Sequence, residues 1–364
     1  MTDANVLLQA RDLRVHFPVR SAGWFGKPVL ARAVDGVSLD LARGETLGLV
    51  GESGSGKTTL GRAVLRRAPL ASGSLHFRGE DITRAGNTQL RQLRRHMQLV
   101  FQDPSTSLNP RHTVFDAIAE PLIVHGWSAG RDALRRRVAQ LIGQVGLPAD
   151  AAQRYPHAFS GGQRQRVGIA RALAVQPDLI VADEPVSALD VSVRAQIINL
   201  FQDLQQELGL SFLLIAHDLA VVRHVSHRIA IMYAGQIVET GPRDDIYQRP
   251  RHPYTRALLA AVPEPRRGAD AQREPYRVAP GEPPSPMSPP SGCRYHPRCP
   301  LATERCRQEA PPLLTGASGP PAEPAIPVTP TAPATPRSSV APHSSVAPAH
   351  AVACWFADQI PATP

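Results

Sequence analysis

The sequence has no long hydrophobic run and no hydrophobic leader. No uninterrupted apolar stretch approaches the ~18–20 residues that a membrane-spanning helix needs, so we expect no integral membrane protein. The first five residues lack the charged segment and apolar stretch of a secretion signal, so we expect a cytosolic chain. With 42% apolar residues among 364, the chain can still bury a sizeable core, as two domains or as one large α/β domain with an appendage.

Lysine is nearly absent. Lys27 and Lys57 are the only two lysines among 40 basic residues, and the rest are arginine. This skew indicates no function, because genome composition alone can produce it. The net charge of +9 is compatible with nucleic acid, anionic lipid or nucleotide phosphate as a partner. Charge alone does not choose among the three.

Cysteine is absent before residue 293, and proline is scarce before residue 263. Residues 1–262 carry 13 of the 37 prolines, and residues 263–364 carry the other 24. A compact domain does not easily accommodate roughly one proline in four residues, because each removes a backbone donor and fixes φ. We therefore predict a boundary near Val262. The expected parts are a folded domain (1–262), an extension (263–314), a disordered Ala/Pro/Ser linker (315–350) and a last segment (351–364).

Short apolar runs alternate with helical patterns in the first 262 residues. Buried strands are expected at 46–50, 97–101, 179–182 and 212–216, with a helix from Lys57 and others near 112–125, 132–146, 162–175 and 192–208. This alternation predicts a mainly parallel sheet covered on both faces. A separate antiparallel patch is expected at 7–17, 33–41 and 73–77, and a hairpin at 229–233 and 236–239.

One glycine-rich stretch has the spacing of a phosphate-binding loop. Residues 51–58 match G-x-x-x-x-G-K-[ST] between a predicted strand and a predicted helix, the two contexts that this motif requires. Its backbone N–H groups can surround phosphate oxygens, and the helix adds the positive end of its dipole. We expect Lys57 to reach the β- and γ-phosphates and Thr58 to ligate Mg²⁺. The alternative, a turn that matches by accident, needs a coincidence on the order of one in a thousand.

Two acidic residues close another predicted strand. Asp183 and Glu184 directly follow the apolar run 179–182. In a P-loop fold this places Asp183 near Mg²⁺ and Glu184 beside the attacking water as general base. Taken alone, two acids at a strand end would more often be a simple cap, but the phosphate-binding loop in the same chain favours catalysis.

A third motif, residues 159–163, precedes a helical pattern. Ser-Gly-Gly alone is an ordinary loop or helix cap, but here it lies between the phosphate-binding loop and the acidic strand end. Over residues 7–262 the combination resembles the nucleotide-binding subunit of an ABC transporter, departing only at Phe159, where leucine is usual. The resemblance implies an α/β P-loop NTPase with an antiparallel β subdomain, a helical subdomain at about 103–172 and a Pro/Cys-rich C-terminal extension.

The resemblance also implies roles for single residues. Phe17 would stack on adenine, with an ordinary strand aromatic as an equal alternative. Glu184, His217 and Lys57 would be catalytic. The loop at 160–163 would close on ATP held by a second subunit, and Asp190 would cross to that subunit. The implied ATP contacts are Phe17, Gly51, Glu52, Ser53, Gly54, Ser55, Gly56, Lys57, Thr58, Thr59 and Gln102; the Mg²⁺ ligands are Thr58, Gln102 and Asp183; the signature residues are Ser160, Gly161, Gly162 and Gln163.

The residues after the predicted hairpin indicate a particular group within the ABC transporter resemblance. The stretch His-Pro-Tyr-Thr at 252–255, the helical 256–262 and the downstream cysteines resemble ATPase subunits of oligopeptide and dipeptide importers. This resemblance implies two transmembrane permeases, a second ATPase subunit and, indirectly, an extracytoplasmic solute-binding protein. It places the chain on the cytoplasmic face of the membrane, with no nucleic acid partner. Similar importers handle peptides, glutathione or nickel, so the solute stays open.

All four cysteines lie in the extension and the last segment: Cys293, Cys299, Cys306 and Cys354. A disulfide framework is not expected in a cytosolic chain. Four thiolates suit tetrahedral zinc or an iron–sulfur cluster, and the C-x₂-C spacing of common zinc sites is absent. Some similar ATPases carry such a cluster at these cysteines. Four unrelated thiols are the alternative.

Two other function classes fit parts of the pattern. A soluble ABC ATPase acting on nucleic acid or in translation usually carries coiled coils, inserted zinc modules or two cassettes, whereas this chain has one cassette and no heptad run. A regulatory subunit with a degenerate site is opposed by the intact Glu184 and His217. We therefore predict an ATPase that energises peptide import through ATP-driven dimerisation.

Overall fold

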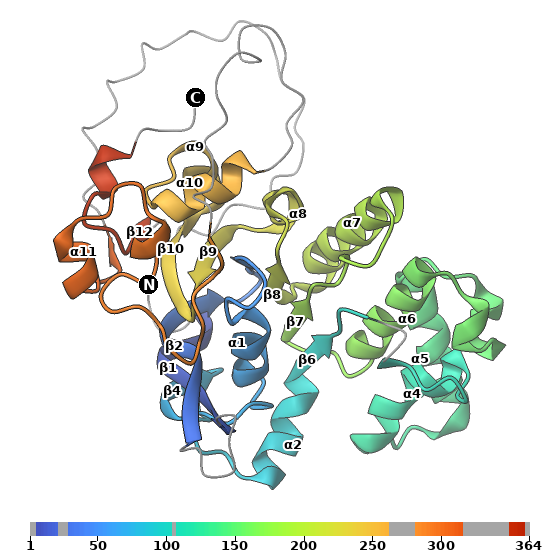
Figure 1. Cartoon of the computed structure of the whole chain (residues 1–364). Helices are drawn as coiled ribbons and strands as arrows, with labels where there is room; N and C mark the ends of the chain where they lie inside the picture. The colour runs from blue at the N-terminus through green and yellow to red at the C-terminus, as the bar shows by residue number, and fades with distance from the viewer. Residues whose placement is uncertain (1–4, 21–27, 104–106, 262–280, 316–348, 361–364) are drawn as a thin grey trace, which may run out of the picture.

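The computed structural model describes residues 5–20, 28–103, 107–261, 281–315 and 349–360. The predicted boundary near Val262 and most of the predicted linker, 316–348, lie outside the described residues. Two sheets, the helices around them and a lateral group of helices make up the described fold (Figure 1). Among the described residues, no helix combines the length and the apolar character needed to cross a bilayer.

An eight-stranded sheet forms the centre of the fold. Its strand order is β11-β12-β10-β9-β3-β8-β7-β6; the five strands from β9 to β6 run parallel, and the three at the other edge are antiparallel. This arrangement confirms the predicted mainly parallel sheet and the predicted hairpin, which is β9 and β10. The bounds are β3 (Thr46–Val50), β6 (Met97–Val100), β7 (Leu179–Asp183), β8 (Ser211–Ala216), β9 (Arg228–Tyr233), β10 (Gln236–Pro242), β11 (Leu314–Thr315) and β12 (Ala351–Val352).

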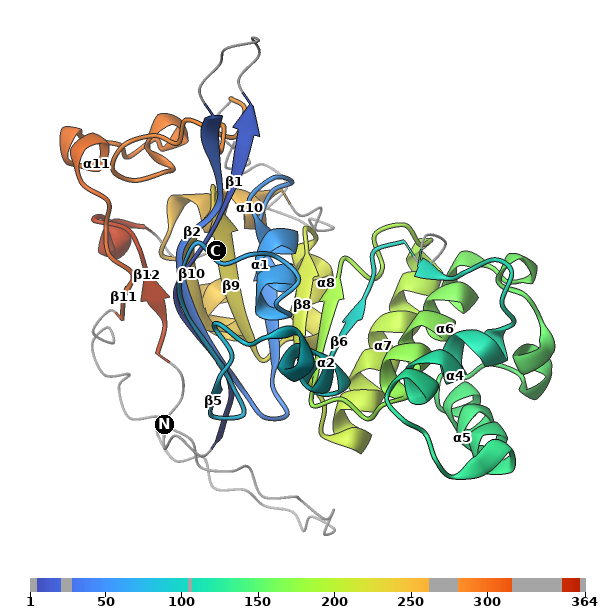
Figure 2. The ribbon, with the colours of Figure 1, turned by 90° about the horizontal axis from the view of Figure 1, so that it is seen from below.

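A second sheet is antiparallel, as predicted, with the order β2-β1-β4-β5. Helix α1 (Lys57–Val64) lies between this sheet and the central sheet, as Figure 2 shows. Leu60 of α1 packs in one buried cluster with Leu13 of the second sheet and Leu213 of the central sheet. Burial of this shared apolar surface holds the two sheets together. The strand bounds are β1 (Val6–Arg20), β2 (Pro28–Ala42), β4 (Ser72–Phe77) and β5 (Glu80–Asp81).

The lateral helices α4, α5 and α6 form the expected helical subdomain (Figure 1). Reciprocal side-chain caps begin α4 at Thr113 and α6 at Ser160, which satisfies backbone donors at both helix starts. The helix bounds are α2 (Asn87–His96), α4 (Val114–Val124), α5 (Gly130–Gln144), α6 (Gly161–Leu173), α7 (Val191–Leu208), α8 (Leu219–Val225), α9 (Arg243–Gln248), α10 (Pro253–Ala260) and α11 (Glu304–Gln308); 3₁₀ turns are η2 (Ala149–Gln153), η3 (Pro156–Ala158), η5 (His296–Arg298) and η6 (Ala357–Gln359).

Among the described residues before Val262, three short helices were not predicted from the sequence. Helix α2 buries only Leu90 and Leu93 among ten residues, so its apolar pattern is too sparse to identify from the sequence. Helices α8 and α9 have seven and six residues, which is less than two full turns each. Tertiary contacts, rather than a periodic apolar pattern in the sequence, therefore determine where these three helices form.

The extension is part of the central sheet. Strand β12 pairs with β10, and β11 pairs with β12, so both ends of the predicted linker join the fold: Thr315 lies in β11, and His350 contacts Glu239 of β10 at 2.6 Å. We call the described residues 281–315 and 349–360 the extension from here on. Pairing with β12 covers the edge of β10, whose backbone N–H and C=O groups would otherwise be exposed there.

Candidate functional site

The glycine-rich loop, residues 51–56, connects β3 to α1. Gly56 has a φ of 104°, which residues with a side chain rarely adopt. A Cβ at Gly56 would clash with the carbonyl oxygen of Ala33 on β2, and one at Gly51 would clash with that of Met232 on β9. Glycine is therefore required at positions 51 and 56 because β2 and β9 lie directly against the loop. The sequence predicts a second reason, which is the close approach of phosphate to the loop backbone.

Lys57 is buried at the start of α1, and its ammonium group contacts the loop backbone. Its Nζ donates to the carbonyl oxygens of Gly51, at 2.7 Å, and Glu52, at 2.9 Å. Burial lowers the pKa of Lys57, while the negative charges of Glu184, Asp183 and Glu52 act in the opposite direction. A triphosphate in the loop would offer this ammonium group further anionic acceptors.

Two of the three predicted Mg²⁺ ligands lie together. The Thr58 hydroxyl donates to Oδ1 of Asp183 at 2.9 Å, although the two residues are 125 positions apart. A hydroxyl and a carboxylate are hard oxygen ligands of the kind that Mg²⁺ takes beside phosphate and water. Burial raises the pKa of Asp183, and the hydrogen bond from Thr58 opposes this shift. The pair therefore fits the predicted cation, whereas the third predicted ligand, Gln102, contacts Glu184.

Glu184 is the meeting point of the predicted catalytic residues. Its Oε2 accepts a hydrogen bond from Nε2 of Gln102 at 3.0 Å and lies 3.2 Å from Nδ1 of His217. These residues follow β7, β6 and β8, which are neighbours in the parallel sheet, so the carboxyl ends of the strands bring them to one edge. Glu184 has a φ of 47°, an uncommon conformation for a residue with a side chain and one that is often found at functional sites.

The signature residues form the start of α6. The Ser160 hydroxyl accepts the Gln163 N–H at 3.3 Å, and the Gln163 side chain accepts the Ser160 N–H at 3.0 Å. Gly162 is buried, and a Cβ there would clash with Val193 of α7. The loop lies in the lateral helical subdomain, apart from α1 (Figure 1). The structure therefore does not bring these residues to the phosphate-binding loop of their own chain.

Sequence reasoning missed two residues that contact the phosphate-binding loop from later in the chain. The Tyr254 hydroxyl accepts the Glu52 N–H at 2.8 Å, and Nη1 of Arg298 forms an ion pair with Oε2 of Glu52 at 2.9 Å. Tyr254 lies in the stretch at 252–255 that marks the importer family, but the sequence gives no sign that it faces the loop.

Comparisons with known proteins support the resemblance. Residues 34–187 match the ABC transporter family, and residues 238–306 match the oligopeptide/dipeptide transporter C-terminal region. The oligopeptide transport ATP-binding protein AppF of Bacillus subtilis is 49% identical over 320 residues, which is 87% of this chain and 97% of AppF. The di/tripeptide transport ATP-binding protein DppF of Pseudomonas aeruginosa is 50% identical over 307 residues, 84% of this chain and 94% of DppF. The chain belongs to the ABC transporter family, among the oligopeptide/dipeptide ATP-binding proteins.

Solved structures agree with this ABC ATP-binding fold. The ATP-binding cassette MJ0796, a dimer bound to ADP and Pi, has a TM-score of 0.58 and 27% identity, covering 65% of this chain and 99% of that one. The fold also matches cbiO1 from Clostridium perfringens, with a TM-score of 0.58, 24% identity and coverage of 67% and 91%. The predicted fold class is therefore confirmed.

Three residues with predicted roles in this ABC ATP-binding subunit lie outside the glycine-rich loop. Phe17 lies on β1 opposite Ala31 of β2 and is 37% exposed, which is compatible with stacking on adenine and with an ordinary strand aromatic. Asp190 begins α7, is exposed and makes no side-chain capping bond. Thr59 lies in the first turn of α1. The remaining predicted ATP contacts are in the loop itself: Ser53, Gly54 and Ser55.

The four cysteines of this ABC ATP-binding subunit are free thiols, and all four lie in the extension. In the described part of the chain, no group of three or more His, Cys, Asp or Glu side chains is arranged to hold a metal ion. Burial raises the pKa of Cys299 to about 11 and that of Cys354 to about 12, and the charges of neighbouring thiols act in the same direction. A metal ion that bound these thiols would have to displace their protons. The described residues therefore give no support to the predicted iron–sulfur cluster or to zinc.

Proposed function

We propose that this chain is the ATP-hydrolysing subunit that energises peptide import through an ABC transporter. The observation that carries the proposal is the convergence of Gln102, Glu184 and His217 beside the phosphate-binding loop and the Thr58–Asp183 pair. The names of the relatives, which specify oligopeptide and di/tripeptide transport, support a peptide as the solute. They give no support to a nucleic acid partner.

The site supports in-line hydrolysis of ATP. The loop amides and Lys57 hold the phosphates, and bound Mg²⁺ supplies charge neutralisation at Thr58 and Asp183. Glu184 accepts a proton from the attacking water while the water oxygen bonds to the γ-phosphorus. The bond from the γ-phosphorus to the bridging oxygen breaks, which leaves ADP and phosphate. Gln102 and His217 hold the Glu184 carboxylate in position through their contacts with it.

A second ATPase subunit completes each site. Residues 160–163 form the start of α6 in the lateral subdomain, apart from α1 and the phosphate-binding loop of their own chain, so they are available to the γ-phosphate of ATP bound by a partner. ATP then joins two subunits, and hydrolysis releases them, which is a two-state element biased by the γ-phosphate. Two permeases would receive this motion at the cytoplasmic face of the membrane, and a solute-binding protein would act indirectly.

Glu184→Gln tests the chemical part of the proposal. The amide keeps the size of the side chain but cannot accept the proton, so ATP binding should persist while turnover falls about 100-fold or more. Release of phosphate and binding of a fluorescent ATP analogue measure the two effects. Glu207→Gln on the exposed end of α7 is the matched control and should hydrolyse ATP at the wild-type rate. Unchanged turnover in Glu184→Gln would assign the general base elsewhere.

The same variant tests the transport part. Tagged Glu184→Gln, purified from detergent-solubilised membranes of its own cell with ATP and Mg²⁺, should carry two multi-span permeases, identified by mass spectrometry. The permeases and any attached solute-binding protein would then report the solute. Recovery of ribosomes or DNA-repair proteins without a permease would overturn the transport function and leave the ATPase chemistry intact.

A further inference from the structure

The extension inserts three neighbouring side chains into the ATPase core. They belong to the segment between Cys293 and Cys299. Arg294, Tyr295 and Arg298 are each at most 8% exposed. Burial of two arginines is costly unless each charge is paired. Both are paired with carboxylates of the core. Arg294 pairs with Asp35 on β2, whereas Arg298 pairs with Glu52 in the phosphate-binding loop.

The partner of Arg298 is Glu52, the residue that follows Gly51 in the phosphate-binding loop. Every polar group of Glu52 is engaged. Its N–H donates to Tyr254 at 2.8 Å, its carboxylate accepts from Arg298 at 2.9 Å, and its carbonyl oxygen accepts from Lys57 at 2.9 Å. Two of these three contacts come from beyond the central strands of the ATPase. The start of the phosphate-binding loop is therefore held in place by residues that come much later in the chain, Tyr254 and Arg298.

Aromatic packing holds the two outside partners in place. Tyr233, at the end of β9, lies with its ring centroid 4.6 Å from that of Tyr254 and 5.2 Å from that of Tyr295. The guanidinium carbon of Arg298 lies 5.9 Å from the Tyr233 ring centroid. Packing of this kind reduces the rotamer freedom of Arg298, so less entropy is lost when it binds the carboxylate.

We propose that Arg298 is a positioning residue of the ATP site. It orients Glu52 and offsets the negative charge of Glu52, which would otherwise repel the phosphates of ATP next to Lys57. The inference rests on the proposed function, since it concerns the same nucleotide. The extension is thereby a working part of the ATPase as well as a covering for the sheet edge.

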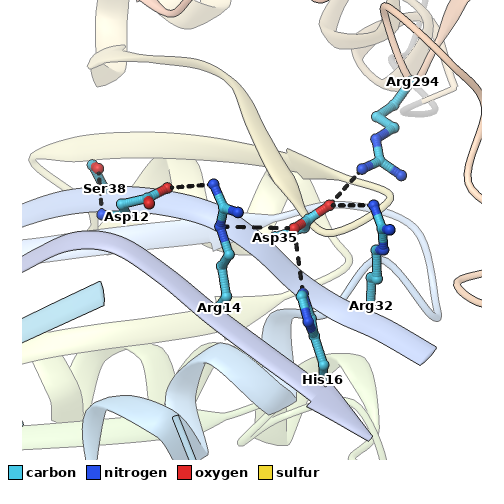
Figure 3. A network of polar contacts seen from close by, with 7 residues as sticks. All are labelled: Asp12, Arg14, His16, Arg32, Asp35, Ser38 and Arg294. Carbon is cyan, nitrogen blue, oxygen red and sulfur yellow. Dashed lines mark hydrogen bonds and ion pairs between the residues drawn. The ribbon is translucent and has the colours of Figure 1, made fainter. Parts of the chain in front are cut away.

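Arg294 provides a matched comparison within the same segment. Its Nη2 forms an ion pair with Oδ2 of Asp35 at 2.5 Å, and the Arg294 and Asp35 side chains are 9% and 11% exposed, against 8% and 25% for Arg298 and Glu52. Figure 3 shows Asp35 on β2 with His16, Arg14 and Arg32 beside it, so two arginine charges remain near Asp35 without Arg294. Loss of Arg294 removes a docking contact of the extension but no contact to the phosphate-binding loop.

The experiment compares Arg298→Met with Arg294→Met in the full chain. Both should lower Tm to a similar extent, because each removes a buried ion pair between extension and core. Arg298→Met should weaken MgATP binding about tenfold and raise KM with little change in kcat, whereas Arg294→Met should stay within about twofold of wild type. Arg298→Lys should restore part of the affinity. Equal losses in the two Met variants, or none in Arg298→Met, would overturn the proposal.

Glu52→Gln gives a second, independent readout. It preserves the shape of the loop and leaves the Arg298 charge free to act on the phosphates, so MgATP binding should tighten severalfold. The double variant Glu52→Gln/Arg298→Met should bind more tightly than Arg298→Met alone. A double variant as weak as Arg298→Met would overturn the charge-offset argument. Failure of the wild-type chain to bind MgATP would instead refute the proposed function.

Discussion

His252 is a buried imidazole that begins helix α10. Its Nδ1 accepts the N–H of Tyr254 at 3.1 Å, and its ring lies 5.7 Å from that of Tyr295, measured between centroids. Burial lowers the pKa of His252 to about 3. The ring is therefore neutral in the folded chain at physiological pH, and its protonation would break the cap on α10. This cap holds Tyr254, whose hydroxyl accepts from the phosphate-binding loop.

The lowered pKa of His252 predicts that the free energy of unfolding depends on pH. Below a pH of about 6.5 the unfolded chain protonates His252 while the folded chain does not until about pH 3, so folding becomes less favourable as pH falls through this window. His252→Asn keeps a capping acceptor and cannot titrate. Between pH 7.5 and 5.0 the wild type should lose about 2 kcal/mol relative to this variant. Urea unfolding at the two pH values measures the difference, and a pH-independent difference would contradict the argument.

At the scale of elements, Glu239 of β10 joins three parts of the chain. The side chain is fully buried, and its carboxylate accepts the N–H groups of Arg251, at 2.6 Å, and His252, at 3.0 Å. The same group lies 2.6 Å from Nε2 of His350, just before β12. Strand β12 then pairs with β10 beside it, through Glu239 and Val352. One carboxylate thus fixes the approach to α10 and the returning C-terminal strand.

Removal of this carboxylate should be costly. Glu239→Ala leaves one buried and one half-buried backbone donor and one imidazole without their acceptor, and we expect a loss of about 3 kcal/mol in the free energy of unfolding. His350→Ala removes one of the three partners and should cost about 1–2 kcal/mol. Unfolding of both variants in guanidinium chloride measures which of the two loses more free energy of unfolding. A Glu239→Ala cost no larger than that of His350→Ala would show that the backbone contacts contribute little.

At the scale of the whole molecule, the proposed function divides the ATP site into two half-sites carried by each chain. The phosphate-binding loop and the carboxyl ends of the parallel strands form one half, and the start of α6 forms the other, in the lateral subdomain (Figure 1). The relative MJ0796 is described as a dimer. Two chains arranged head to tail would place each α6 against the nucleotide of the other.

This arrangement predicts an ATP-dependent change of mass. Glu184→Gln with ATP and Mg²⁺ should double from 39.2 kDa in size-exclusion light scattering, and should remain a monomer with ADP. Adding Ser160→Arg to Glu184→Gln should keep ATP binding but abolish the dimer, because a long cation replaces the exposed serine of the partner-facing loop. A constant mass in the single variant would mean that a different ATPase chain supplies the second half.

Much of the site follows from contiguous residues. The spacing at 51–58 and the two acids after an apolar strand indicate a P-loop NTPase, because successive backbone groups alone build the phosphate cradle and the strand end. Alternating apolar runs predicted the central parallel strands, since burial on both faces leaves a continuous hydrophobic stretch. The convergence of Gln102 and His217 on Glu184 depends on the strand order, which only the structure supplied.

What the sequence by itself determined is therefore the chemistry of the nucleotide site and the layered fold around it. Only the tertiary structure decided the role of the extension: the Arg298–Glu52 pair joins residues 246 positions apart, and β12 adds to a strand more than 100 positions earlier. An ion pair or a two-residue strand leaves no periodic signal along the chain. Such contacts form because burial and charge pairing select them in three dimensions, after the local elements already exist.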